Sequence, residues 1–249
     1  MAQSLPLEPI VRHLLGGRTK ITVLDAGCGA RSLFRYARGA RRVGIDISPE
    51  QLARNDALAE KIVGDIQTHR FDAERFDLIV CWDVLEHLPR PQEAVRNLVM
   101  ALKPGGLMLL VSPNVLSLRG LVTKLTPRWA HVWYYRHVIG NPRAGTPGSP
   151  PFDSFHRLAM SLPALESLAK ALGLDLVYSC LTHIGRPEDV KYPRLMSMWH
   201  RANAVVSSLS LGKIATDDEQ TLEMILRKPR KSTPPPCQSQ SSRRSARPT

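Results

Sequence analysis

Cysteine is scarce in this sequence, and its spacing excludes the usual zinc sites. The 249 residues contain four cysteines, and none of them forms a C-x-x-C pair or a His/Cys cluster with zinc spacing. Cys28, Cys81 and Cys180 stand in apolar, strand-like surroundings, where a free cysteine behaves as a small core residue. We therefore expect no metal site, and a protein that works in the reducing cytoplasm.

Long uncharged apolar runs are also missing. Residues 1–19 contain no sustained apolar stretch of the length that a signal peptide or a membrane-spanning helix requires. We expect these residues to form a helical extension ahead of the first strand. The expected location is cytoplasmic, and contact with the inner face of a membrane stays open as an alternative.

Acidic residues are absent after Glu223, although seven arginines and lysines follow it. These seven charges make up more than half of the net charge of +12, so the rest of the chain is only modestly basic. The overall charge therefore does not indicate a nucleic-acid groove. Residues 229–249 are rich in Pro, Ser and Arg, which predicts a disordered basic tail because such a segment buries little apolar surface.

Short apolar runs alternate with amphipathic stretches between residues 20 and 112. This alternation predicts a doubly wound α/β fold with a mostly parallel sheet, because strands that are apolar throughout are covered on both faces. One domain, residues 20–228, would hold seven strands. We expect strands at 20–26, 41–47, 61–65, 76–82, 107–113, 174–181 and 219–228, and helices at 31–39, 48–58, 90–106 and 161–174.

The regular alternation is lost in two segments. Residues 113–157 follow the fifth expected strand and contain many Pro and Gly around the aromatic-basic stretch "PRWAHVWYYRHVIG". Residues 182–218 form an excursion whose apolar residues recur at a helical period. We interpret residues 113–157 as a cover over the substrate site. For the aromatic-basic stretch three readings stay open: the core of a small subdomain, a substrate lid, or a contact with an anionic membrane surface.

The first expected strand ends in a glycine turn, in "VLDAGCG". Ligands of an open parallel sheet bind outside the carboxyl ends of its strands, and glycine lets the backbone approach them closely. Asp46 ends the next strand in "VGIDIS", 21 residues after Asp25, where a carboxylate can accept both ribose hydroxyls. With "GDI" at 64–66 after the third strand, three points on one sheet edge indicate a nucleoside-binding site.

The glycine turn lacks the third glycine of the dinucleotide fingerprint, since Ala30-Arg31-Ser32 follows Gly29. The motifs "VLDAGCG", "VGIDIS", "VGDIQ" and "FDLIVCWDVLEHLPRPQEAVRNLVMALKPGGLMLLVSPN", in this order, resemble the class I S-adenosylmethionine-dependent methyltransferases, particularly the small-molecule group with ubiquinone-type O-methyltransferases. The resemblance covers residues 20 to about 114 and returns at 155–181 and 219–228. It implies a Rossmann-like methyltransferase fold and S-adenosyl-L-methionine as the cofactor.

The resemblance also implies which residues contact that cofactor. The glycine turn would line its methionine part, the end of the second strand its ribose and adenine, the end of the third strand the adenine edge, and the end of the fourth strand the methionine amino group. In this order the residues are Asp25, Gly27, Cys28 and Gly29; Asp46 and Ile47; Asp65 and Ile66; Cys81 and Trp82.

Methyl transfer to oxygen needs an aligned donor and acceptor, and a general base near neutral pKa assists it. The candidate bases are His87, in "DVLEHLPRP" at the sheet edge, and His156, ahead of the helix at 161–174. A structural role for His87, fixing its loop through hydrogen bonds, is the competing reading. We interpret His131 and His137 as surface groups and Glu86 as a structural partner of the loop.

These observations predict methyl transfer, most simply at oxygen, to a small-molecule, lipid or lipid-linked glycan acceptor. The position of the cover after the fifth strand also looks like that of bacterial-type methyltransferases acting on lipid-linked or glycan intermediates. Two alternatives stay open: a methyltransferase-fold binding protein without catalysis, and an RNA methyltransferase. The second is disfavoured because "SPN" at 112–114 replaces the Asn/Asp-Pro-Pro-aromatic motif of amino-methylating enzymes. The sequence does not indicate an oligomeric state.

Overall fold

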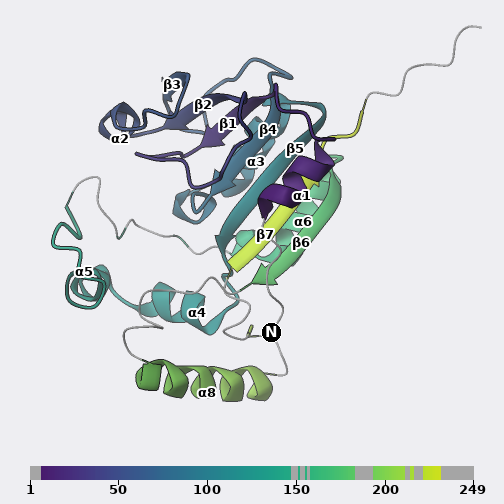
Figure 1. Cartoon of the computed structure of the whole chain (residues 1–249). Coiled ribbons are helices and arrows are strands. Elements are labelled where there is room, and N and C mark those ends of the chain that lie inside the picture. Colours follow the sequence, from purple (N-terminus) through teal and green to yellow (C-terminus); the bar gives the residue numbers. More distant parts are fainter. Residues whose placement is uncertain are drawn as a thin grey trace, which may run out of the picture.

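One seven-stranded sheet, in the order β3-β2-β1-β4-β5-β7-β6, forms the centre of the protein (Figure 1). The structure is a computed structural model, and it describes residues 7–146, 151, 155, 158–182, 193–210, 214–215 and 221–230. Strands β1 to β5 run parallel, whereas β7 is antiparallel to both of its neighbours. The mostly parallel, doubly wound sheet is thereby confirmed. The strands are β1 (Thr22–Ala26), β2 (Arg41–Asp46), β3 (Glu60–Val63), β4 (Phe76–Trp82), β5 (Leu102–Pro113), β6 (Asp175–Thr182) and β7 (Thr221–Arg227).

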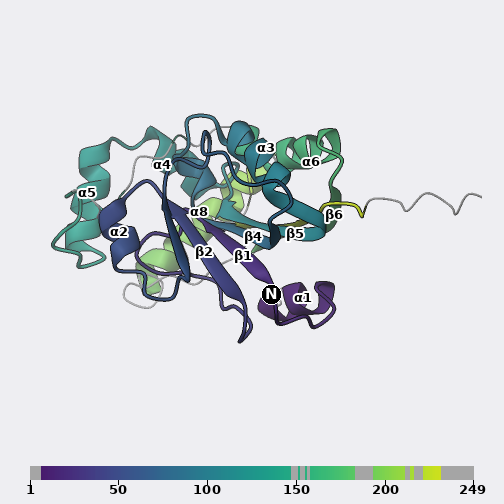
Figure 2. The same ribbon diagram turned by 90° about the horizontal axis from the view of Figure 1, so that it is seen from above.

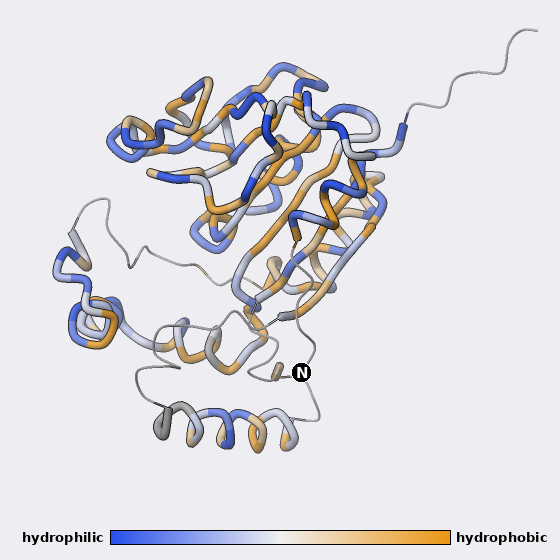
Figure 3. Tube along the Cα trace, viewed as in Figure 1, coloured by the Kyte–Doolittle hydropathy of each residue, from blue (hydrophilic) through white to orange (hydrophobic). Residues whose placement is uncertain are grey.

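Two apolar cores cover the two faces of the sheet, as strands that are apolar throughout require (Figures 2 and 3). Helices α3 (Pro91–Ala101) and α6 (Leu162–Ala171) pack on one face. Helix α1 (Leu7–Leu14) packs on the other face through Leu7 and Val11, so a helix does precede the first strand. The short helix α2 (Pro49–Ala53) follows β2, and Ser48 caps it by accepting a 3.2 Å hydrogen bond from the Gln51 amide.

The prediction of a helix over 31–39 is wrong. Residues 27–40 form an irregular crossover between β1 and β2. Phe34 and Tyr36 both turn inward there and meet edge to face with ring centroids 5.2 Å apart. Side chains two residues apart do not share a helical face, so burying both rings on one sheet face requires a non-helical backbone.

The boundary between α3 and β5 lies earlier than the sequence predicts. Leu102 already pairs with Phe76 of β4, and the Gly105 amide donates a 2.7 Å hydrogen bond to the Lys228 carbonyl. Pro104 and the two glycines after it therefore belong to the strand and not to the end of the helix. The proline is tolerated because it lies near the start of the strand, where a missing donor costs little.

Three helices lie beyond the carboxyl end of β5, apart from the sheet (Figure 1). They are α4 (Leu118–Leu125), α5 (Arg128–His137) and α8 (Pro193–Leu209). Ser117 caps α4, and the Ala215 amide donates a 2.9 Å hydrogen bond to the Leu116 carbonyl, which ties this region to the segment after α8. Short 3₁₀ helices, η1 (Leu85–His87) and η2 (Leu158–Met160), precede α3 and α6.

The sequence did not predict helices α4 and α5, whereas α8 lies where the apolar period at 182–218 indicated a helix. The expected roles of the cover at 113–157 and of this excursion stay predictions. The disordered tail expected at 229–249 falls almost wholly outside the described residues. None of the described helices is both long enough and apolar enough to cross a lipid bilayer.

Candidate functional site

The parallel register brings the carboxyl ends of β1, β2 and β4 to one edge of the sheet. Ala26 pairs with Ile45 on one side and with Cys81 on the other, and Asp46 pairs with Val63 of β3. The segments after these four strands therefore share the rim at which an open α/β sheet binds its ligands.

The glycine turn after β1 needs both of its glycines. Gly27 has φ +73° and Gly29 has φ +52°, a backbone region that residues with a side chain rarely adopt. A Cβ on Gly27 would lie 2.5 Å from Val84, and one on Gly29 would lie 2.7 Å from Gln51. The Gly27 amide donates to the Ile45 carbonyl at 2.8 Å, which folds the turn over the end of β2.

Asp46 links this turn to the start of α2. Its Oδ2 accepts a 2.8 Å hydrogen bond from the Gly29 amide, and its Oδ1 accepts a 2.9 Å bond from the Ser48 amide. A carboxylate oxygen can accept two hydrogen bonds, so each oxygen retains one acceptor position. Two such positions beside a turn with two glycines suit the two hydroxyls of a ribose, and the residues present therefore fit a nucleoside cofactor.

Asp25 lies under the crossover and not at the open rim. Burial raises the pKa of its carboxyl from 3.8 to about 6, while the hydroxyls of Ser32 and Tyr36 and the Arg42 guanidinium oppose this rise. Its Oδ2, the Ser32 hydroxyl and the Tyr36 hydroxyl are buried together, and the two hydroxyls favour the charged form of the carboxyl. This part of the site is a buried polar cluster beneath the crossover.

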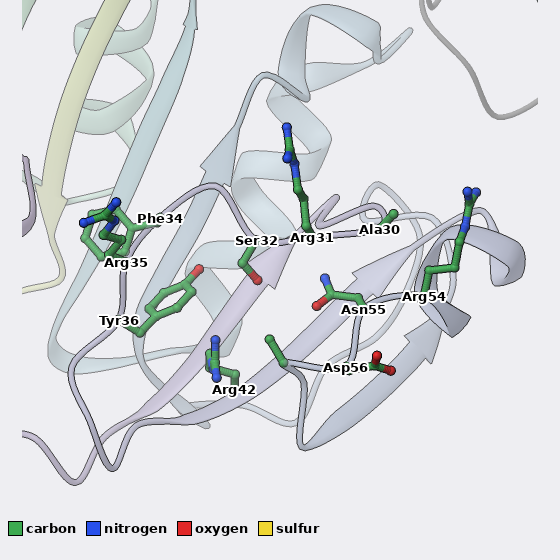
Figure 4. Close-up of a pocket in the computed structure, with 11 residues that line it drawn as sticks. Ala30, Arg31, Ser32, Phe34, Arg35, Tyr36, Arg42, Arg54, Asn55 and Asp56 are labelled. Carbon is green, nitrogen blue, oxygen red and sulfur yellow. The ribbon is translucent and has the colours of Figure 1, made fainter. Parts of the chain in front are cut away.

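An open hollow of about 580 Å³ adjoins the crossover, between residues 30–36 and 54–57 (Figure 4). The Tyr36 hydroxyl points toward Ser32 in it, whereas the guanidinium groups of Arg31, Arg35 and Arg54 lie apart from one another. The hollow lies beside the irregular crossover that stands where a helix was expected.

The remaining cofactor candidates differ in how accessible they are. Ile47 is 74% exposed at the rim, where it can cover a flat ring, whereas Ile66 belongs to the buried core. Asp65 is held by the Gln67 backbone amide at 2.8 Å and by the Gln67 side chain, whose Oε1 accepts from the Arg90 amide. Because the Ile66 side chain is buried, any contact that Ile66 makes with a ligand would have to come from its backbone.

The cysteines of the site are buried. The Cys28 sulfur packs against Gly44, where an added Cβ would lie 2.7 Å from it. Cys81 is fully buried inside β4, and burial raises the pKa of its thiol well above the usual range. Trp82 is half-buried at the end of the same strand. Neither thiol is thus available as a nucleophile, because the thiolate is the reactive form.

His87 and Glu86 lie side by side on η1, directly after β4. The His87 Nε2 is 3.8 Å from the Glu86 Oε1, and the His87 side chain is partly exposed, whereas Glu86 is buried. Burial and the neighbouring Asp83 raise the pKa of Glu86 from 4.5 to about 8. The Glu86 carbonyl accepts a 2.8 Å hydrogen bond from the Phe155 amide, so residue 155 of the expected cover returns to this edge.

Several of these features were not anticipated from the sequence. The burial of Glu86 and the grouping of Ser32 and Tyr36 around Asp25 depend on tertiary packing and leave no signal in the spacing of residues. His156 lies outside the described residues. In the part of the chain that is described, no three His, Cys, Asp or Glu side chains gather as a metal site would require.

The fold and this edge together define a class of protein: an α/β domain that binds a nucleoside-type cofactor at the carboxyl ends of its parallel strands. A protein family described as "Methyltransferase domain" matches residues 3–179. The chain belongs to this family. Its motifs resemble the class I methyltransferases, which implies S-adenosyl-L-methionine as the cofactor.

Curated relatives resemble only part of the chain. "Ubiquinone biosynthesis O-methyltransferase" of Coxiella burnetii is 36% identical over 101 residues, which are 37% of this chain and 43% of that protein. The protein of the same name from Alkalilimnicola ehrlichii is 33% identical over 141 residues, which are 49% of this chain and 57% of that protein. The chain thus spans about half the length of the curated relatives that it matches.

Solved structures share the fold over most of the chain. An S-adenosylmethionine-dependent methyltransferase from Mesorhizobium loti has a TM-score of 0.55 at 15% identity and covers 88% of this chain and 96% of that one. One from Methanosarcina mazei has a TM-score of 0.55 at 17% identity, over 91% of this chain and 100% of that one. The [4+2]-cyclase SpnF also matches, with a TM-score of 0.53 at 16% identity over 90% of this chain and 81% of that one. These likenesses show the fold and not the reaction.

Proposed function

We propose that this protein transfers the methyl group of S-adenosyl-L-methionine to an oxygen atom of a small-molecule, lipid or lipid-linked glycan acceptor. The observation that supports it most is the Asp46 carboxylate, which is fixed to the Gly29 and Ser48 amides and keeps an acceptor position on each oxygen. When bound, the cofactor supplies an electrophilic methyl group on a sulfonium centre.

The protein's own residues would hold and orient the donor. Asp46 would accept the two ribose hydroxyls, and the exposed side chain of Ile47 would cover the adenine. Gly27 and Gly29 would let the methionine part approach the backbone closely. Positioning of this kind supplies most of the catalysis in an in-line displacement, because little covalent chemistry is left to the protein.

His87 would accept the proton that the acceptor hydroxyl loses. With a pKa of about 8, the neighbouring Glu86 is mostly protonated at neutral pH and carries no charge beside the imidazole. His156, which follows Phe155 in the chain, remains the second candidate base.

The acceptor class is supported by the names of the relatives. Two curated relatives matching residues of this domain are called ubiquinone biosynthesis O-methyltransferases, which favours a hydroxyl oxygen on a small or lipid-like molecule. The match covers about half of each relative, so the acceptor itself is part of the proposal.

Titration calorimetry with S-adenosyl-L-methionine tests the cofactor site. We expect Asp46→Asn to weaken binding by about tenfold or more, because one retained amide oxygen cannot replace a charged, doubly accepting carboxylate. Asp56→Asn is the matched control, since Asp56 is an exposed acid in the next turn. Absence of binding by the native protein, or equal binding by both variants, would refute the assignment.

Two alternatives predict different results in the same experiments. A binding protein without catalysis would give calorimetric heat but no S-adenosylhomocysteine with any hydroxyl acceptor. The [4+2]-cyclase SpnF shares the fold, so the fold alone does not establish methyl transfer. An RNA methyltransferase would methylate RNA and would lose activity with its basic tail, whereas we expect a chain ending at residue 230 to retain small-molecule turnover.

A further inference from the structure

Helices α4, α5 and α8 contain no acidic residue. The sequence has no Asp or Glu between Glu93 and Asp153, which includes both α4 and α5, and none within residues 193–209 of α8. These three helices carry six arginines and lysines. Surface helices of soluble proteins ordinarily mix both signs of charge, so a surface of one sign indicates an anionic partner.

Large apolar side chains are exposed on the same three helices. Leu125 is 83% exposed, Trp129 73% and Leu209 80%. No residue of α5 is buried, although the helix contains two tryptophans and two tyrosines. The complete set, which we call the α4–α5–α8 surface, consists of Val122, Leu125, Trp129, Trp133, Met198, Val205 and Leu209.

In α5 the exposed tryptophans share one face with a positive charge. Trp129, Trp133 and Arg136 follow at i, i+4 and i+7, and all three are exposed. Tryptophan and arginine together suit the boundary between water and lipid, where the rings meet the headgroup level and the charges meet phosphate.

Helix α8 exposes apolar side chains and buries polar ones, which is the reverse of a helix that faces water. Met198, Val205 and Leu209, at i, i+7 and i+11, form an exposed apolar stripe. On the other side of the helix Asn203 and Ser207 are buried. A helix that buries amide and hydroxyl groups while exposing Met, Val and Leu indicates that its outer face meets an apolar medium.

The surface lies next to the proposed acceptor site. Helix α4 begins five residues after the end of β5, whose carboxyl end is at the rim with Trp82. The Phe155 amide hydrogen-bonded to Glu86 brings the chain after α5 back beside His87. In Figure 1 the three helices lie beyond this end of the sheet.

We propose that the α4–α5–α8 surface docks on an anionic lipid bilayer, with its apolar side chains in the interface and its arginines and lysines against the headgroups. Charge complementarity selects an anionic partner, and the exposed leucines, valines and methionine select a bilayer over RNA, because RNA stacks on aromatic rings but gains little from aliphatic side chains. This inference stands apart from the proposed reaction and would bring a lipid-borne acceptor to the rim beside His87.

Vesicle flotation of the full chain tests the docking. We expect binding to vesicles of phosphatidylglycerol and phosphatidylcholine in equal parts, and much weaker binding to phosphatidylcholine alone. Replacement of Trp129 and Trp133 by alanine should lower the bound fraction by about tenfold, since both side chains lose interfacial contact. Met100→Ala is the matched control, because Met100 is 64% exposed on α3, away from this surface.

A second variant separates this surface from the basic tail. Lys124→Glu with Arg201→Glu introduces acids on α4 and α8 at exposed positions and should weaken binding to the anionic vesicles while leaving the far-ultraviolet circular dichroism unchanged. Tail-driven binding would survive both sets of changes and would vanish in about 1 M salt, where the Debye length is about 3 Å. That result, no flotation of the native chain, or displacement from vesicles by RNA would overturn the proposal. Cofactor binding by calorimetry is read separately, so the two proposals fail independently.

Discussion

Three carboxyl groups near the rim of the sheet differ because their surroundings differ. Asp46 accepts two backbone hydrogen bonds and lies at the open edge. Asp25 and Glu86 are buried, and burial raises both pKa values, to about 6 and about 8. Of the three groups, only Glu86 is mostly protonated at neutral pH.

His87 is the residue whose removal separates catalysis from binding. We expect His87→Ala to lower turnover by about 10²-fold while cofactor affinity is preserved, because the role proposed for the histidine concerns the acceptor proton and not the donor. Steady-state rates and calorimetry on the same preparation measure both. His13→Ala, an exposed histidine of α1, is the control. A near-native rate for His87→Ala would leave the loop-fixing role as its function.

The sequence located the rim residues because their chemistry follows the ends of strands. Asp46 was identified by its position after an apolar run, and the structure does direct its carboxylate to the glycine turn. Glu86 could not be identified in this way, because its burial comes from tertiary packing around η1, which the spacing of residues does not encode.

At the scale of elements, the strands were predictable and the crossover was not. Uninterrupted apolar runs such as "FDLIVCW" specify a strand covered on both faces, and β4 has the expected bounds. The stretch 31–39 has residues that favour a helix, yet the demand to bury Phe34 and Tyr36 on one face overrides that preference. For α4 and α5 the sequence did not predict a helix where the structure has one. The Pro and Gly residues nearby indicated an irregular segment instead.

The glycine turn offers a test of how tightly β1 packs against the start of η1. Gly27→Ala would place a methyl group 2.5 Å from Val84 at a φ of +73°, so we expect a loss of stability of about 2–4 kcal/mol and weaker cofactor binding. Gly173→Ala has a φ of +67° with nothing within 4 Å, so it reports the backbone strain alone. Urea unfolding of both variants measures the difference. Equal losses would mean that the contact with Val84 does not constrain the turn.

At the scale of the whole molecule, two sets of carboxyl groups set the pH range of stability. Hydrogen bonds and ion pairs with Lys103 and Arg75 lower the pKa values of Asp77 and Glu60, so these residues stabilise the fold above their ordinary values and lose that effect in acid. Asp25 and Glu86 act in the opposite sense. Their pKa values are higher in the folded chain, at about 6 and about 8, so the stabilisation from their bound protons is full in acid and is lost as pH rises through those values.

These opposing effects predict a free energy of unfolding that is largest near pH 4–5 and falls by about 5 kcal/mol toward pH 8. Glu86→Gln should flatten the upper part of this decline, because an amide has no proton to lose. Glu93→Gln, which changes an exposed acid paired with Arg90, should leave the decline in place. Urea unfolding at a series of pH values compares the slopes, which are insensitive to any constant loss of stability in the variant. A native profile that stays level between pH 5 and pH 8, or a Glu86→Gln profile as steep as the native one, would show that Glu86 ionises in the fold as readily as in the unfolded chain.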